Sequence, residues 1–145
     1  MTTAIFTMLE TPKGKRVVEA NRVIDAVSRH GRRFFWCEQK QSISRFEIDR
    51  RSRIWLVDKW TGRRIYVAYE GRWKGFSDGG TLKSLIEALR DYISTGEPIN
   101  PRYFGPWPQH YCDGDLWGYG LEAMEALRVE LDGMPAVGPR AKAAA

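Results

Sequence analysis

The chain has 145 residues, of which 43% are hydrophobic, and a formal net charge of +5. This length and apolar content are enough for one hydrophobic core but not for two. No apolar run approaches the ~20 residues of a membrane-spanning helix, and the first ten residues lack the basic and apolar parts of a signal peptide. We therefore expect one domain over residues 1–135, in the cytoplasm and without a membrane partner.

The charges are distributed unevenly along the chain. From Arg29 to Arg64 there are eleven lysines and arginines against four acidic residues, whereas from Asp113 to Asp132 there are six acidic residues and one arginine. Two interpretations are open. Either the two regions pair with each other across the fold, or the basic region is a surface for an anionic partner.

The first predicted element is an amphipathic helix over residues 15–30. Thr11 is a candidate N-cap, and Pro12 suits the first helical position. For the first ten residues, which precede this helix, we expect either a short extra strand or no regular structure. Apolar residues recur at helical spacing in this segment, namely Val17, Ala20, Ile24 and Val27.

Residues 32–70 are rich in β-branched and aromatic residues and are interrupted by short polar turns. They predict a four-stranded antiparallel meander, whose strands lie in RRFFWCEQK, SISRFEID, SRIWLVDKW and RRIYVAYE. A two-residue turn at Thr61 and Gly62 would set the register of the last hairpin. In that register Leu56 lies opposite Val67 on the core face, and Lys59 lies opposite Arg64 on the other face.

Two helices are predicted after the meander. The first, over residues 81–94, carries an apolar stripe that should cover the core face of the sheet, formed by Leu82, Leu85, Ile86, Leu89 and Ile93. LEAMEALRVELDG predicts an acidic final helix, and residues 136–145 predict a disordered tail or a cloning scar. The expected fold class is α+β, in the order α-β-β-β-β-α-α with a possible extra N-terminal strand.

The segment FGPWPQHYCDGDLWGYG, residues 104–120, concentrates residue types that are used in metal sites and catalysis. The chain holds two histidines and two cysteines, but not in the paired spacing of a zinc site. His110 and Cys112 would point to opposite sides of an extended segment. We expect a packing loop with no metal, no cofactor and no catalytic residue, whose side chains are a candidate secondary contact surface formed by Trp107, His110, Trp117 and Tyr119.

The strongest candidate site is the face of the meander opposite the core. Its basic and aromatic residues are Arg45, Arg53, Trp55, Lys59, Arg64 and Tyr66. Arginine and lysine contact phosphates, aromatic rings stack on bases, and a three-stranded sheet can enter a major groove. The alternative is that Trp55 and Tyr66 lie under a helix as a second core layer.

In size and general texture the chain resembles the small single-domain proteins of phages and other mobile elements, although no motif carries that resemblance. We expect a non-enzymatic protein that binds nucleic acid through the basic aromatic face. One alternative is an interaction protein that regulates or inhibits a protein of nucleic-acid machinery by binding its acidic surface. A second alternative is an enzyme that uses the 104–120 loop. The oligomeric state is left open.

Overall fold

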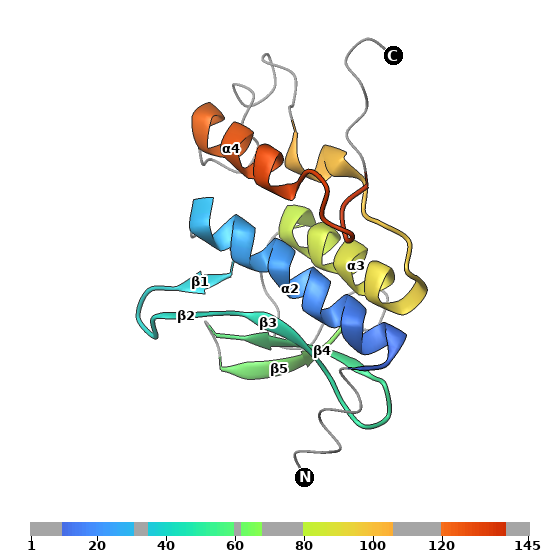
Figure 1. Cartoon of the computed structure of the whole chain (residues 1–145). Helices are drawn as coiled ribbons and strands as arrows, with labels where there is room; N and C mark the ends of the chain where they lie inside the picture. The colour runs from blue at the N-terminus through green and yellow to red at the C-terminus, as the bar shows by residue number, and fades with distance from the viewer. Residues whose placement is uncertain (1–9, 31–34, 60–61, 68–79, 106–119, 139–145) are drawn as a thin grey trace.

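The computed structural model describes residues 10–30, 35–59, 62–67, 80–105 and 120–138 (Figure 1). Its elements are α2 (Pro12–His30), β1 (Trp36–Cys37), β2 (Ser42–Ile43), β3 (Arg45–Ile48), β4 (Ile54–Asp58), β5 (Arg63–Tyr66), α3 (Gly80–Thr95), a 3-10 helix η1 (Pro101–Phe104) and α4 (Leu121–Leu131). The strands form two antiparallel sheets, β1-β2 and β3-β4-β5. The predicted α+β class with a single domain is confirmed. The extra strand expected near the N-terminus falls on residues outside the described ranges.

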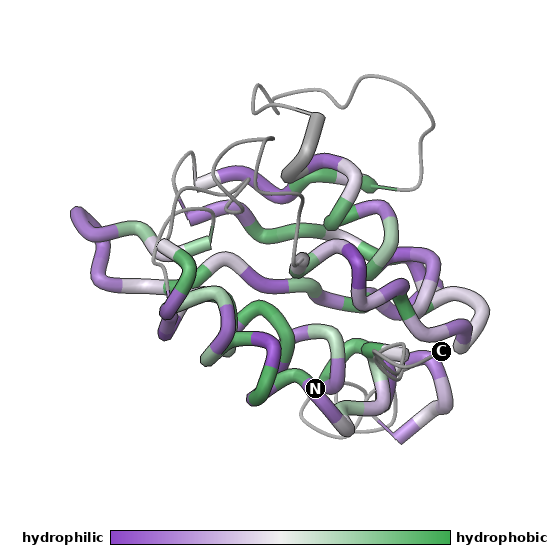
Figure 2. The backbone as a smooth tube through the Cα atoms, turned by 90° about the horizontal axis from the view of Figure 1, so that it is seen from above, coloured by the Kyte–Doolittle hydropathy of each residue, from purple (hydrophilic) through white to green (hydrophobic). Residues whose placement is uncertain are grey.

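The described elements form three layers (Figure 1). The three-stranded sheet lies on one side, α2 and α3 lie beside each other against it, and α4 lies on the far side of these two helices. Hydrophobic and polar positions alternate along the helices (Figure 2), so that each helix directs an apolar side into the shared core. No helix in the described ranges is long and apolar enough to cross a bilayer.

Helix α2 begins at Pro12, earlier than the predicted start at residue 15. The hydroxyl of Thr11 accepts a hydrogen bond from the Gly14 N–H at 3.0 Å, which is the N-cap that the sequence indicates. This cap and the preset backbone of Pro12 outweigh the basic residues that oppose the helix dipole in the first turn. The four apolar positions predicted for this helix are all buried.

The predicted four-stranded meander is wrong in its layout, because its second strand is divided at Ser44. The chain pairs with β1 before this residue and with β4 after it. Ser44 is buried, and its hydrogen-bonding groups are used at the break. Its N–H donates to the Phe35 carbonyl at 2.8 Å, and its hydroxyl accepts from the Lys59 N–H at 2.9 Å.

A side chain of α2 closes the outer edge of β3. The Asn21 amide donates to the Phe46 carbonyl at 3.0 Å and accepts from the Phe46 N–H at 2.8 Å. These are the two hydrogen bonds that a further strand would make at this position. At this position the Asn21 side chain therefore takes the place of a further strand.

Replacing Asn21 by alanine is expected to lower the free energy of unfolding by about 1–2 kcal/mol, because both Phe46 groups lose their partner in a partly buried position. Urea denaturation measures this difference. Arg22→Ala is a matched control on the same helix, since its side chain is 52% exposed and its ion pair with Glu19 contributes little. Equal stability of the two variants would contradict the role given to Asn21.

The β4–β5 hairpin has a longer loop than predicted. Asp58 pairs with Arg63, so four residues separate the two paired positions. Gly62 has a φ of 73°, and its N–H donates to the Asp58 carbonyl at 2.8 Å. Glycine adopts this left-handed conformation without steric cost. Gly62 is therefore the last residue of a four-residue loop, whereas the prediction made it the second residue of a two-residue turn.

The longer loop shifts the predicted register by two residues. Trp55 lies opposite Tyr66 and Val57 lies opposite Arg64, so the predicted pairing of Lys59 with Arg64 is wrong. A shift of two leaves every side chain on its original face. The core face is therefore the predicted one, with Ile54, Leu56, Ile65 and Val67 buried.

Helix α3 packs its predicted stripe into the core. Leu85, Ile86, Leu89 and Ile93 are fully buried, whereas the side chain of Leu82 lies outside the described set. Arg90 adds a polar connection to the sheet, since its Nη1 donates to the Val67 carbonyl at 2.8 Å.

The packed chain extends into the segment expected to be a tail. Ala136 and Val137 are buried, and Val137 forms a parallel bridge with Ile99. Burial of two residues and a backbone pairing tie the chain to the body as far as Gly138. Residues 139–145 lie outside the described ranges.

Candidate functional site

One face of the three-stranded sheet, which we call the outer face, is turned away from the helices (Figure 1). The register places two rows of side chains across it, Arg45, Val57, Arg64 in one and Glu47, Trp55, Tyr66 in the other. None of the described helices covers these rows. The alternative in which Trp55 and Tyr66 lie beneath a helix is therefore not found in the described part of the chain.

The half-buried indole ring of Trp55 is the centre of the outer face. The Tyr66 ring lies with its centroid 5.1 Å away at an interplanar angle of 41°. The Arg64 guanidinium carbon lies 4.5 Å from the Trp55 ring centroid, and that of Arg53 lies 5.6 Å from it. Both distances are within the range of cation–π attraction, so the indole holds the two arginines on the sheet surface.

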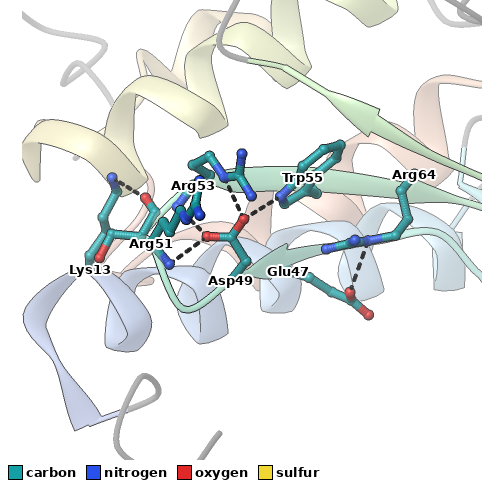
Figure 3. Close-up of polar contacts among 8 residues, drawn as sticks. Lys13, Glu47, Asp49, Arg51, Arg53, Trp55 and Arg64 are labelled. Atoms are coloured by element: carbon teal, nitrogen blue, oxygen red, sulfur yellow. Dashed lines mark hydrogen bonds and ion pairs between the residues drawn. The ribbon is translucent and has the colours of Figure 1, made fainter. Parts of the chain in front are cut away.

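Asp49 organises the turn that leads into β4 (Figure 3). Its Oδ1 accepts hydrogen bonds from the backbone N–H groups of Arg51 and Arg53, each at 2.9 Å. Its Oδ2 accepts from Arg53 Nε at 2.7 Å and from Trp55 Nε1 at 3.0 Å. One carboxylate thus fixes the turn, one arginine and the edge of the tryptophan.

These contacts keep Asp49 ionised. Partial desolvation raises the pKa of the carboxyl, but the hydrogen bonds from Trp55, Arg53 and Arg51 outweigh it and hold the pKa well below its usual range. The negative charge is therefore part of the local structure at neutral pH and well into the acid range.

Glu47 is the second carboxylate of the outer face. Its Oε1 lies 3.8 Å from Arg64 Nε, and the side chains of Glu47 and Arg64 are 49% and 51% exposed. An ion pair this long and this exposed is weak and is screened by salt. Arg64 can therefore exchange Glu47 for an external anion at little cost.

The structure brings together four of the six residues predicted for the site. Arg53, Trp55, Arg64 and Tyr66 form one contact group. Arg45 is exposed and lies on the same face, in the row of Arg64. Lys59 is set apart, because it lies in the hairpin loop after β4.

Sequence reasoning did not identify Asp49 and Lys13 as parts of this surface. Lys13, from the first turn of α2, donates from Nζ to the Ser52 carbonyl at 2.6 Å and so adds a cation beside the turn (Figure 3). This contact joins segments far apart in the sequence and leaves no local signal. Asp49 does leave one, since an aspartate followed by polar residues, here RRSR, is typical of a side chain that caps its own turn.

The two oppositely charged regions of the chain meet at one place among the described residues. Glu130 of α4 pairs with Arg29, and its Oε1 lies 2.9 Å from His30 Nε2. This contact joins the end of α2 to α4. Arg53 and Arg64 instead pair with carboxylates of their own turn and sheet, Asp49 and Glu47.

The other candidate positions have different outcomes. In the described ranges, no three histidine, cysteine, aspartate or glutamate side chains gather as metal ligands, and Cys37 is a buried free thiol. His110 and Cys112 lie outside those ranges, so the absence of a metal stays a prediction. The secondary contact surface of Trp107, His110, Trp117 and Tyr119 also lies entirely outside them.

The fold and the outer face define a small α+β protein with a cationic, aromatic surface on a three-stranded sheet. The chain belongs to the YoqU family, which matches residues 11–134 and so includes every element from α2 to α4. It is 27% identical over 117 residues to the "SPbeta prophage-derived uncharacterized protein YoqU" of Bacillus subtilis (strain 168), across 79% of this chain and 77% of that protein. No solved structure matches significantly. Similarity to a prophage-derived protein agrees with the resemblance of the sequence to small single-domain phage proteins.

Proposed function

We propose that this protein is a non-enzymatic nucleic-acid-binding protein whose outer face contacts the phosphate backbone. The main observation in support of this proposal is that Arg53 and Arg64 are grouped around Trp55, on a sheet face that no described helix covers. Guanidinium groups held in place offer paired donors to phosphate oxygens and lose little entropy on binding.

The charges near this group support the proposal. Arg45 is exposed in the same row as Arg64, and Lys13, Arg50 and Arg51 lie at or beside the turn before β4. Asp49 and Glu47 neutralise only part of this charge. The remaining positive potential attracts a polyanion and makes binding sensitive to salt.

The test is binding of purified, nuclease-treated protein to labelled nucleic acid over a range of salt concentrations. Arg53→Ala is expected to lower the affinity and to reduce the slope of log K against log salt by about 1, as for one lost phosphate contact. Glu47→Gln is expected to act in the opposite direction, because it removes the anion that competes for Arg64.

Arg102→Ala is the matched control for overall charge. Arg102 is exposed on η1, across the helices from the sheet, so its loss changes the net charge equally but leaves the outer face intact (Figure 1). Equal effects of Arg53→Ala and Arg102→Ala would contradict the proposed face. Absence of binding to any nucleic acid at low salt would refute the function and favour the alternative, in which the face binds an acidic protein surface.

A further inference from the structure

This inference rests on the proposed function. The contacts of Trp55 indicate whether the outer face binds single-stranded or double-stranded nucleic acid. Proteins that bind single strands without sequence preference stack bases on open aromatic faces. On the outer face, the Trp55 ring is already in contact with Arg64 at 4.5 Å, Arg53 at 5.6 Å and Tyr66 at 5.1 Å from its centroid. These contacts come from the protein itself and occupy the surface that a base would need.

The edge of the Trp55 ring is held as well. Its Nε1 donates to the ionised Asp49 carboxylate at 3.0 Å, and Asp49 is fixed by the two backbone N–H groups of its turn. Turning the indole to receive a base would break this charge-assisted hydrogen bond and both cation–π contacts. The ring therefore acts as a support for the arginines.

The groups left accessible are the cations. The side chains of Arg53 and Arg64 are 44% and 51% exposed, and Arg45 is exposed beside them. Duplex DNA carries one charge per ~1.7 Å of axis, against one per ~3.4 Å for each strand. A surface that offers phosphate contacts without stacking gains most from the higher charge density. We propose that the outer face binds the sugar–phosphate backbone of double-stranded nucleic acid and does not stack on bases.

The experiment compares four labelled ligands by fluorescence anisotropy at one low salt concentration. They are a short mixed-sequence duplex, each of its two strands alone, and one of these strands with its central bases replaced by abasic sites. The duplex is expected to bind about tenfold more tightly than either strand, because phosphate contacts dominate. The intact and abasic strands are expected to bind equally.

Two results would overturn the inference while leaving the proposed function in place. One is a duplex preference below about threefold, since the charge density of the duplex would then not decide binding. The other is a loss of about tenfold or more on removing the bases, as expected for a stacked base. Failure of all four ligands to bind would instead refute the proposed function itself.

Arg64→Ala provides an independent readout. It removes a phosphate contact and uncovers part of the Trp55 ring. Duplex affinity is expected to fall, with a salt slope reduced by about 1, while single-strand affinity falls less or rises. A larger loss for the single strand than for the duplex would contradict the inference. Arg102→Ala controls for net charge and should leave the ratio of duplex to single-strand affinity unchanged.

Discussion

Replacing Leu85 by alanine is expected to lower the free energy of unfolding by about 2–5 kcal/mol, the range for truncation of a buried leucine that leaves a cavity. Leu85 lies in α3 with 0% of its surface exposed, within the core cluster of described residues that joins the helices to the sheet. Chemical denaturation followed by circular dichroism measures the change.

Leu121→Ala is the matched control, since it makes the same substitution in a helix where the side chain is 50% exposed. Its cost should stay below about 0.5 kcal/mol, as for most surface changes. A loss at Leu85 below about 1 kcal/mol would mean that α3 is peripheral to the core. The assignment of the inward face of the sheet would then also fail, because the same cluster contains Leu56 and Ile65.

Most of the fold was predicted from short-range sequence patterns. Helical spacing of apolar residues located α2 and α3, and the Thr11 cap is present. Alternation in β4 and β5 identified the buried face even though the register was wrong, because a shift of two residues preserves the faces. What sequence did not reveal are the interactions between distant segments. Two examples depend on how the elements pack. Asn21 bonds to the edge of β3, and Ser44 bonds to Phe35 and Lys59.

The same division applies to the candidate site. Period-two alternation placed Arg53, Trp55, Arg64 and Tyr66 on one face, and the structure brings them into contact. Their mutual geometry was not predictable, because it depends on the true hairpin register and on Asp49. An alternation pattern shows which side a residue faces, whereas the availability of Trp55 for stacking depends on the side chains around it.

Asp49→Asn is expected to lower the free energy of unfolding by about 2–3 kcal/mol at neutral pH, because hydrogen bonds to a charged acceptor are lost. Asparagine keeps one oxygen for the backbone N–H groups of the turn. Its NH₂ group cannot accept from Arg53 Nε or Trp55 Nε1, which bond to Asp49 Oδ2 at 2.7 and 3.0 Å. Most of the loss should come from the Trp55 hydrogen bond and from the weaker, uncharged acceptor left for the turn N–H groups, since Arg53 is 44% exposed and its ion pair is screened.

The difference between this variant and the wild type should depend on pH. The folded-state pKa of Asp49 is lowered, so its ionised form stabilises the fold fully above the unfolded pKa of about 3.9. This stabilisation is lost as the pH falls below that value toward the folded pKa. Urea denaturation at pH 7, 5 and 3 should therefore show the same difference at the two higher values and a smaller one at pH 3. A difference that does not change with pH would contradict the role of the charge.

Nucleic-acid binding by Asp49→Asn distinguishes two roles of Asp49, namely positioning Arg53 and Trp55 and lowering the positive potential of the outer face. Asp49→Asn and Glu47→Gln each remove one negative charge from the same surface, but Glu47 makes only a 3.8 Å contact and fixes no turn. If overall potential alone controlled binding, both variants would bind a duplex more tightly by a similar factor. We expect Glu47→Gln to gain affinity and Asp49→Asn to gain less or to lose it, because Arg53 and Trp55 lose their anchor. Equal gains, measured at the same salt concentration, would show that the cations of the outer face act without a fixed arrangement.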